Sequence, residues 1–254
     1  MSGQIETPAD AGLLNAPVGQ IAASRAGAAS VFQTFGIDFC CQGKRTLAEA
    51  LAGQGIAPSP VLAALMSAAA EPLDDWRDAP TPALIDHIKT RYHAVHLAEL
   101  PNLRDLAAKV EATHRKHPAV PDGLAETLSR MIAELRLHQQ REEVVLFPLL
   151  AQGGGEMARA AIQVMRAEHE DHGAVLAGIE AITGGRVAPQ GACATWRALY
   201  LGLGKFHDDL MMHVHLENNV LFPRFETTEG PGNGNPISGC NCLLYTSPSP
   251  RDRT

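Results

Sequence analysis

One stretch of this sequence reads His138-x-x-x-Glu142 and continues as Val145-Leu146-Phe147-Pro148. Seventy-five residues later the same letters return at the same spacing, as His213-x-x-x-Glu217 and Val220-Leu221-Phe222-Pro223. Residues four apart share one face of an α-helix, so each copy directs an imidazole and a carboxylate to one point. Burying such groups is costly unless something pairs with them, and a metal ion would pair with both. The repeat therefore predicts a metal site in a helical core.

The repeat also has an upstream part. His93-x-x-His96 returns as His169-x-x-His172, and the first histidine of each lies 45 or 44 residues before its His-x-x-x-Glu. Each predicted helical hairpin thus supplies one histidine from its first helix and a histidine and glutamate from its second. Two such hairpins packed face to face would bring four histidines and two glutamates to one level of a bundle. This is the general plan of di-metal carboxylate bundles.

The donor set suits two metal ions. Two carboxylates can each bridge two ions, and four neutral imidazoles can cap them, two per ion. A diferrous pair carries a charge of about +4, of which two glutamates offset half, so we expect an oxo, hydroxo or water bridge. Imidazole and carboxylate suit iron, but also zinc, copper and manganese. Spacing alone does not choose the metal.

The remaining histidines are expected outside the ligand set. His114 lies 21 residues past His93, about 31 Å along a continuous helix. It cannot share the site unless the chain reverses near Pro101. His96 and His172 are one turn from the ligands, where substitute ligation is left open. Four others are expected to face solvent: His87, His117, His207 and His215.

The amino-acid composition excludes several classes of protein. Of 254 residues, 45% are hydrophobic and only 5% aromatic, which favours a helical protein with a sizeable core. A net charge of −7 argues against a nucleic-acid or anionic-membrane surface. No apolar run approaches a membrane span, and no signal peptide is recognisable. Five cysteines, an odd number, favour a reducing compartment, so we expect a cytoplasmic protein.

The domain prediction is all-α. A small helical N-terminal domain is expected at 12–71, with helices at 18–35, from the Thr46/Glu49 capping box to Gly53 or Gly55, and from Ser59-Pro60 to Glu71. A linker follows at 72–81. An antiparallel four-helix bundle occupies 82–226, with helices at about 82–115, 122–151, 156–182 and 192–225. Residues 227–254 resemble non-native, disordered sequence, which removes Cys240 and Cys242 from consideration.

Cys40-Cys41 is the second candidate site. Adjacent cysteines rarely bridge each other, because the disulfide would be strained. One reading is that they pack as small apolar side chains. The other is a redox or metal-thiolate pair on a loop between two short helices. Cys193 is expected to be an inert thiol.

These motifs resemble the RIC (repair of iron centres) family of the YtfE/ScdA type, over about residues 12–226. The resemblance rests on Asp38-Phe39-Cys40-Cys41-x-Gly43-Lys44, Arg91-Tyr92-His93, Glu142-Glu143-x-x-Leu146-Phe147-Pro148 and Leu216-Glu217-Asn218-Asn219 with the Val-Leu-Phe-Pro run behind it. It implies a hemerythrin-like bundle behind a short domain bearing the Cys pair. Carried over by position, the iron ligands are His93, His138, His169 and His213, with Glu142 and Glu217 bridging. Gln42 departs from the family, which usually has glycine there.

The resemblance also implies a function. We expect a protein with two non-haem irons that helps to repair iron–sulfur clusters damaged by nitric oxide or peroxide, as an iron donor more than as a conventional enzyme. Its partners would be damaged or apo iron–sulfur proteins, with Cys40 and Cys41 assisting delivery or redox recycling. The alternatives are a hemerythrin-like binder or sensor of nitric oxide or oxygen, and a nitric oxide reductase. Homodimer formation is left open.

Overall fold

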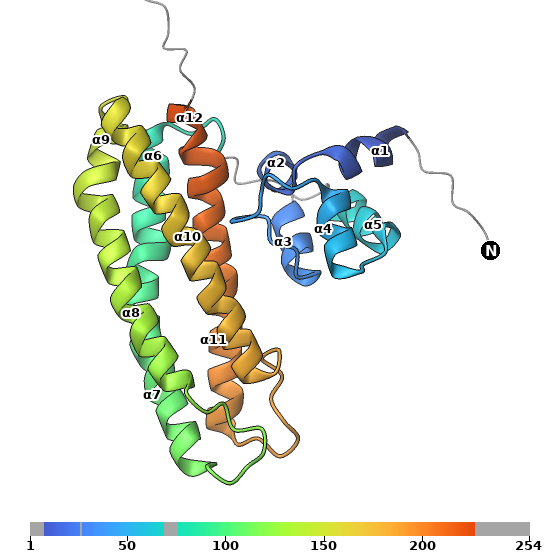
Figure 1. Ribbon diagram of the computed structural model, residues 1–254, viewed down its shortest axis with the longest axis vertical. Helices are drawn as coiled ribbons and strands as arrows, with labels where there is room; N and C mark the ends of the chain where they lie inside the picture. The colour runs from blue at the N-terminus through green and yellow to red at the C-terminus, as the bar shows by residue number, and fades with distance from the viewer. Residues whose placement is uncertain (1–7, 26, 69–75, 227–254) are drawn as a thin grey trace, which may run out of the picture.

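The computed structural model describes residues 8–25, 27–68 and 76–226, and these residues confirm the all-α prediction. Their only β-type pairing is an isolated bridge between Pro17 and Thr46. A long bundle stands beside a smaller group of N-terminal helices (Figure 1). Within the described residues, no helix combines the length and apolarity needed to cross a bilayer.

The N-terminal group consists of five short helices around a core of its own. They are α1 (Pro8–Asn15), α2 (Val18–Ser24), α3 (Ala28–Thr34), α4 (Leu47–Gln54) and α5 (Pro58–Ala68). Fully buried side chains include Phe32, Phe39, Leu47 and Leu65. The predicted capping box is present, since Thr46 Oγ1 accepts from the Glu49 backbone while the Glu49 carboxylate accepts from Thr46 N. Gly55 ends α4 in the left-handed conformation.

Two expectations for this region were wrong, and one helix was missed. The single helix predicted at 18–35 is broken, because Arg25 is extended and Gly27, at φ +67°, caps α3. A Cβ on Gly27 would lie 2.7 Å from Ala68, so close packing against α5 also requires glycine there. The last helix begins at Pro58, before the expected Ser59 cap. Helix α1 was not anticipated.

The bundle is built from four long rods, three of which change helix type. The first is α6 (Thr81–His87), η1 (Ile88–His93) and α7 (Ala94–Thr113); the second is α8 (Leu124–Arg141), η2 (Glu142–Leu146) and α9 (Phe147–Ala151). The third is α10 (Glu156–Thr183), and the fourth is α11 (Ala194–His215), η3 (Leu216–Leu221) and α12 (Pro223–Glu226). Helix α7 runs through Pro101 without ending, as predicted.

The η segments are π-helical and were not predicted. Each closes with a wide turn, as when Phe147 N donates to Glu142 O and Phe222 N donates to Glu217 O. The next residue is proline in both rods, which has no N–H to continue the α pattern. The expanded turns therefore carry the rods past both Phe-Pro steps, and they do so at the two glutamates of the repeat.

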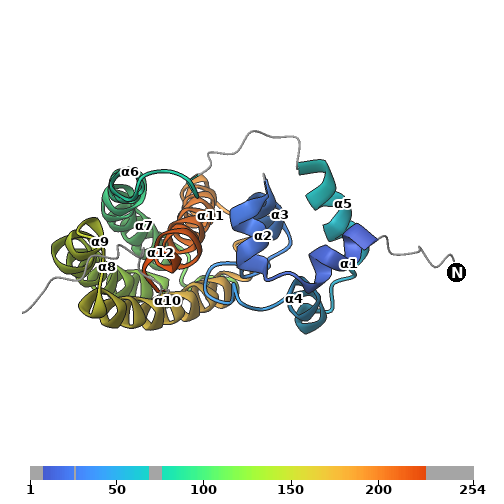
Figure 2. The same cartoon turned by 90° about the horizontal axis from the view of Figure 1, so that it is seen from above.

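Two apolar layers enclose the middle of the bundle. One contains Tyr92, Phe147, Ile162 and Phe222, and the other contains Leu100, Leu135, Trp196 and Phe206. The N-terminal group lies against α10 and α11, as seen down the bundle (Figure 2). The N-terminal group and the bundle pack closely at Asn219 of η3, whose side chain fits between Gly19 and Gly43.

Parts of the predicted domain organisation lie outside the described residues. They are residues 72–75 of the predicted linker and the whole predicted tail, 227–254, which includes Cys240 and Cys242. The proposed domain boundaries stay predictions.

Candidate metal centre

All six side chains expected as ligands meet in the bundle core, and all are buried. They form two groups whose ligand atoms lie within 4.8 Å of one another. The groups are His93, Glu142, His213 and Glu217, and His138, Glu142, His169 and Glu217. Both glutamates belong to both groups, so each group has two histidines of its own and shares two carboxylates.

The histidines pair across the two hairpins. His93 from the first rod joins His213 from the fourth, and His138 from the second joins His169 from the third. Neither hairpin holds a complete group. The sequence repeat therefore builds one composite centre rather than two independent ones.

Local helix type places each ligand. His93 ends η1, Glu142 begins η2, and Glu217 is the second residue of η3. The i, i+4 relation still brings His138 Nε2 within 3.4 Å of Glu142 Oε2 and His213 Nε2 within 3.1 Å of Glu217 Oε1. The π turns thus lie at the level of the centre in three of the four rods.

The orientations of the His138 and His169 imidazoles favour a bound cation between them. His138 Nδ1–H donates to Glu168 Oε2 at 2.7 Å, and His169 Nδ1–H donates to Asn218 Oδ1 at 3.0 Å. Their Nε2 atoms therefore both carry lone pairs, yet they face each other at 3.1 Å. Burial, followed by the charge of His169, holds the pKa of His138 well below its usual value. A shared proton is thus disfavoured, and a positive ion would relieve the repulsion.

The same distance fits a metal ion. Two nitrogens bound at about 2.1 Å and at right angles lie about 3.0 Å apart. The His93 and His213 Nε2 atoms are also 3.1 Å apart, with His93 Nδ1–H donating to Glu143 Oε1 at 2.9 Å. Both histidine pairs thus match adjacent positions on an ion.

The two glutamates are the strongest sign of missing positive charge. Both are completely buried, with the nearest imidazole nitrogens 3.1–3.5 Å from their carboxylate oxygens and no well-aligned hydrogen bond among the described residues. Burial and the neighbouring Glu217 raise the pKa of Glu142 well above its usual value. Burial acts the same way on Glu217, but His213 and His169 outweigh it and hold its pKa well below the usual value. Only added cationic charge would allow both carboxylates to ionise together.

Three partners of the ligands were missed in the sequence. Glu143, Glu168 and Asn218 each accept a hydrogen bond from a ligand Nδ1–H, which orients the imidazole and raises its basicity. Glu143 is exposed on its helix, yet its carboxylate touches a ligand. Arg141 pairs with Glu168, which holds that carboxylate in place. Their adjacency to Glu142, His169 and Glu217 in sequence was the available signal.

His96 and His172 lie next to the centre without joining either group. Both are buried, and both ring nitrogens of His96 and Nδ1 of His172 have no hydrogen-bond partner among the described residues. Burial lowers the pKa of His96 to about 2 and that of His172 to about 4, so both are neutral. His114 lies at the C-terminal end of α7 beside Cys193, with Nε2 at 3.3 Å from Sγ.

The solvent-facing expectation was wrong for His215. It is buried, with its ring edge against Phe39 at 5.2 Å and its Nδ1 accepting from Asn219 Nδ2. The N-terminal group covers it, which helix periodicity alone does not reveal. His87, His117 and His207 are half-buried rather than exposed, and His87 stacks on Trp76 at 4.1 Å.

The Cys40-Cys41 pair lies between α3 and α4 and rests on the bundle. Asp38 Oδ1 accepts from the backbone N–H groups of residues 40, 41 and 42, which fixes a tight loop. Cys41 Sγ donates to the carbonyl of His169 at 3.3 Å, and Asn218 Nδ2 donates to the carbonyl of Cys40 at 3.2 Å. The second candidate site thus contacts the residues that form the first.

Comparison with known proteins gives matches over both parts of the chain. Residues 14–69 match the ScdA_N family, described as a domain of unknown function (DUF542), and residues 84–225 match the hemerythrin HHE cation binding domain. Proteins named iron-sulfur cluster repair protein YtfE from Citrobacter koseri and Escherichia coli O157:H7 are 44% identical over 209 residues. The alignments cover 82% of this chain and 95% of each relative. A protein of that name from Escherichia fergusonii is 43% identical over the same length.

Proposed function

The chain belongs to the YtfE family of iron–sulfur cluster repair proteins, and we propose that it restores damaged clusters by donating iron held in its bundle. The damage would come from nitric oxide or peroxide. The recipients would be apo or damaged iron–sulfur proteins. The free thiols of Cys40, Cys41 and Cys193 support a reducing compartment, the cytoplasm, as the place of action.

One observation carries the proposal: two buried groups of two histidines share the same two glutamates. We assign them to two irons, with Glu142 and Glu217 bridging. Two ferrous ions carry about +4, and the two carboxylates offset half of this. A shell rich in neutral imidazole and poor in carboxylate should hold ferric iron less firmly, which suits a donor better than a store.

Residues of this chain would also control release. Glu143, Glu168 and Asn218 orient three imidazoles, so moving any of them would weaken a ligand without removing it. Cys41 lies against the carbonyl of His169, with Cys40 beside it, so the pair would receive iron as it leaves. Delivery through this pair distinguishes a donor from a carrier of oxygen or nitric oxide, which would need the bundle alone.

The first experiment measures metal content and visible absorbance of protein purified without added metal. Two irons per chain are expected in the wild type and in Glu126→Ala, a matched control on the exposed face of α8. Glu142→Ala and Glu217→Ala should lose most of the iron, with helicity checked by circular dichroism. Zinc, or no stoichiometric metal, in the wild type would overturn the iron assignment.

The second experiment tests donation. Protein loaded with ⁵⁷Fe is mixed with an apo ferredoxin, sulfide and a thiol reductant, and the label in the rebuilt cluster is counted. Transfer that resists a ferrous chelator and falls in Cys40→Ser/Cys41→Ser, but not in Cys193→Ser, supports donation through the pair. Absence of label in the cluster would contradict donation. Turnover of nitric oxide with an electron donor would instead indicate a reductase.

A further inference from the structure

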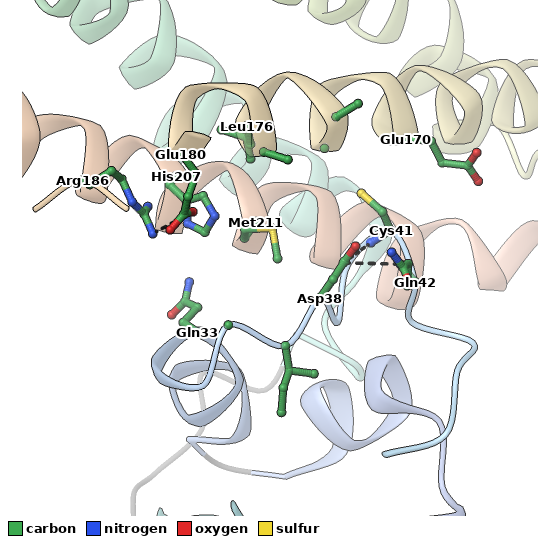
Figure 3. Close-up of a pocket in the computed structure, with 15 residues that line it drawn as sticks. Gln33, Asp38, Cys41, Gln42, Glu170, Leu176, Glu180, Arg186, His207 and Met211 are labelled. Atoms are coloured by element: carbon green, nitrogen blue, oxygen red, sulfur yellow. Dashed lines mark hydrogen bonds and ion pairs between the residues drawn. The ribbon is translucent and has the colours of Figure 1, made fainter. Parts of the chain in front are cut away.

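Three sulfur atoms converge where the N-terminal group meets α11. Cys40 Sγ lies 3.4 Å from Cys41 Sγ and 3.3 Å from the thioether sulfur of Met211. Asp38 Oδ1 is 3.4 Å from the same Sγ. Figure 3 shows the Met211 side chain reaching from its helix toward the loop that carries Asp38 and Cys41. Residues 171 positions apart in sequence thus form one sulfur cluster.

The pair of thiols is poorly suited to a disulfide. Adjacent residues joined by a trans peptide have Cα atoms about 3.8 Å apart, below the roughly 4.4–6.8 Å of ordinary disulfides. Both thiols are free. The loop therefore holds two sulfurs together in the reduced state, which is the arrangement of a chelate.

The sulfur donors favour an ion of soft character. Metal–sulfur bonds of about 2.3 Å with sulfurs 3.4 Å apart correspond to an S–metal–S angle of about 95°. Two thiolates and a thioether form a donor set that favours Cu(I) over harder ions. We propose that Cys40, Cys41 and Met211 form a binding site for Cu(I), separate from the histidine–glutamate centre.

An ion can reach this site from solvent. Cys41 and Met211, both half-buried, border a groove of about 600 Å³ between the N-terminal group and α10 (Figure 3). Cys40 and Cys41 also border a second groove of about 790 Å³. The second groove is lined by Lys44, Arg45 and Arg166 and by the carboxylates of Glu170 and Glu226, of which Glu226 pairs with Arg166.

Binding requires the loss of two protons. The hydrogen bond with Cys41, together with burial, raises the pKa of Cys40, so this thiol is protonated at neutral pH. Coordination displaces the protons of both thiols to solvent, because a bound metal deprotonates its thiol ligands. Cu(I) and two thiolates sum to a charge of −1, and the Asp38 carboxylate adds to it; Lys44 and Arg45 of the second groove would offset part of this charge. No electron is exchanged.

The test is a Cu(I) titration of the iron-loaded full chain against bathocuproine disulfonate without oxygen. Cys240→Ser and Cys242→Ser are present in every sample, so that thiols at positions 240 and 242 do not compete. One Cu(I) per chain is expected, lost in Cys40→Ser/Cys41→Ser. Met211→Leu should weaken binding at least about tenfold. Met212→Leu, the neighbouring residue on α11, is the matched control and should bind like the wild type.

X-ray absorption gives a readout that a merely structural role of Met211 would not change. Three sulfurs per copper are expected in the wild type and in Met212→Leu, and two in Met211→Leu. Copper that remains bound in the double serine variant would overturn the site. Two sulfurs in the wild type would remove Met211 from it, even if Met211→Leu failed to fold. Zn(II) bound as tightly as Cu(I) would overturn the choice of ion.

Discussion

Asn218 Oδ1 lies 3.0 Å from Nδ1 of His169, and Nδ2 of the same side chain donates to the carbonyl of Cys40. One amide therefore orients a proposed iron ligand and holds the cysteine loop. Asn218 is buried, so neither bond competes with bulk solvent. Together with the contact of Cys41 Sγ to the His169 carbonyl, this side chain links the bundle centre to the N-terminal group.

The two bonds of Asn218 can be separated by substitution. Asn218→Asp keeps an acceptor for His169 but has no donor for Cys40, whereas Asn218→Leu removes both. We expect Asn218→Leu to lower iron affinity by about 10–100-fold, since losing such a partner disorders the imidazole. Asn218→Asp should keep the affinity yet expose Cys40 to thiol reagents. Chelator competition and thiol alkylation rates measure the two effects, with exposed Asn102→Leu as control. Equal affinity in Asn218→Leu and wild type would refute the orienting role.

The four proposed histidine ligands differ in whether a hydrogen-bond acceptor orients them at Nδ1. This difference predicts which of the two metal positions fills first. His138 and His169 both have an acceptor at Nδ1, whereas His213 Nδ1 has none among the described residues. The pair His138–His169 should therefore bind the first ion. Crystals of metal-free protein given one equivalent of Mn(II) should show anomalous density mainly at that pair. Anomalous density mainly at His93–His213 would contradict this order of loading. Glu168→Leu removes the acceptor of His138 and should shift the density toward the His93–His213 pair.

Much of the bundle could be predicted because its signals are local. The i, i+4 repeat put His138 with Glu142 and His213 with Glu217, and the Thr46/Glu49 cap placed a short helix. These patterns depend on helix geometry within a few residues. The all-α fold follows from them, and the assembled structure agrees.

What was missed depends on contacts between distant segments. The crossing of His93 to His213 joins residues 120 positions apart, and no spacing within one helix reveals it. The π turns lie at ligands in η1, η2 and η3, and in η2 and η3 a Phe-Pro step follows directly. The burial of His215 follows from the docking of Phe39, which lies in another part of the chain. Helix periodicity carries none of this information.

The close surroundings of Gly19 predict that a side chain there would disturb the packing of the N-terminal group against the bundle. A Cβ at this position would lie 2.5 Å from Asn219 Oδ1 and 3.0 Å from Gly43 Cα, so Gly19→Ala must displace the asparagine or the loop. We expect a loss of about 1–3 kcal/mol in the free energy of unfolding. Gly178→Ala, in α10 with nothing within 4 Å, should instead gain about 0.5–1 kcal/mol. Urea unfolding measures both, and a stabilised Gly19→Ala would contradict the close docking.

His215 predicts a loss of stability in mild acid. Burial lowers its pKa to about 4, against a smaller opposing contribution from a hydrogen bond to the Phe39 backbone. The unfolded chain has a histidine pKa of about 6.5 and binds the proton first. Between about pH 6.5 and 4 the unfolded state therefore holds more protons, and stability falls as pH falls. Above pH 7 the group is neutral in both states and contributes no pH dependence.

Substituting His215 should flatten this part of the pH profile. At pH 5 the shift corresponds to about 2 kcal/mol lost relative to pH 7.5, given about 1.4 kcal/mol per pKa unit. His215→Gln cannot titrate, so its loss between those two pH values should be smaller by about that amount. His207→Gln, a half-buried histidine on the same helix, serves as control for the titration of other groups. Urea unfolding of the metal-free variants at both pH values measures the difference. Parallel profiles for His215→Gln and wild type would show that His215 can accept a proton without loosening its contact with Phe39.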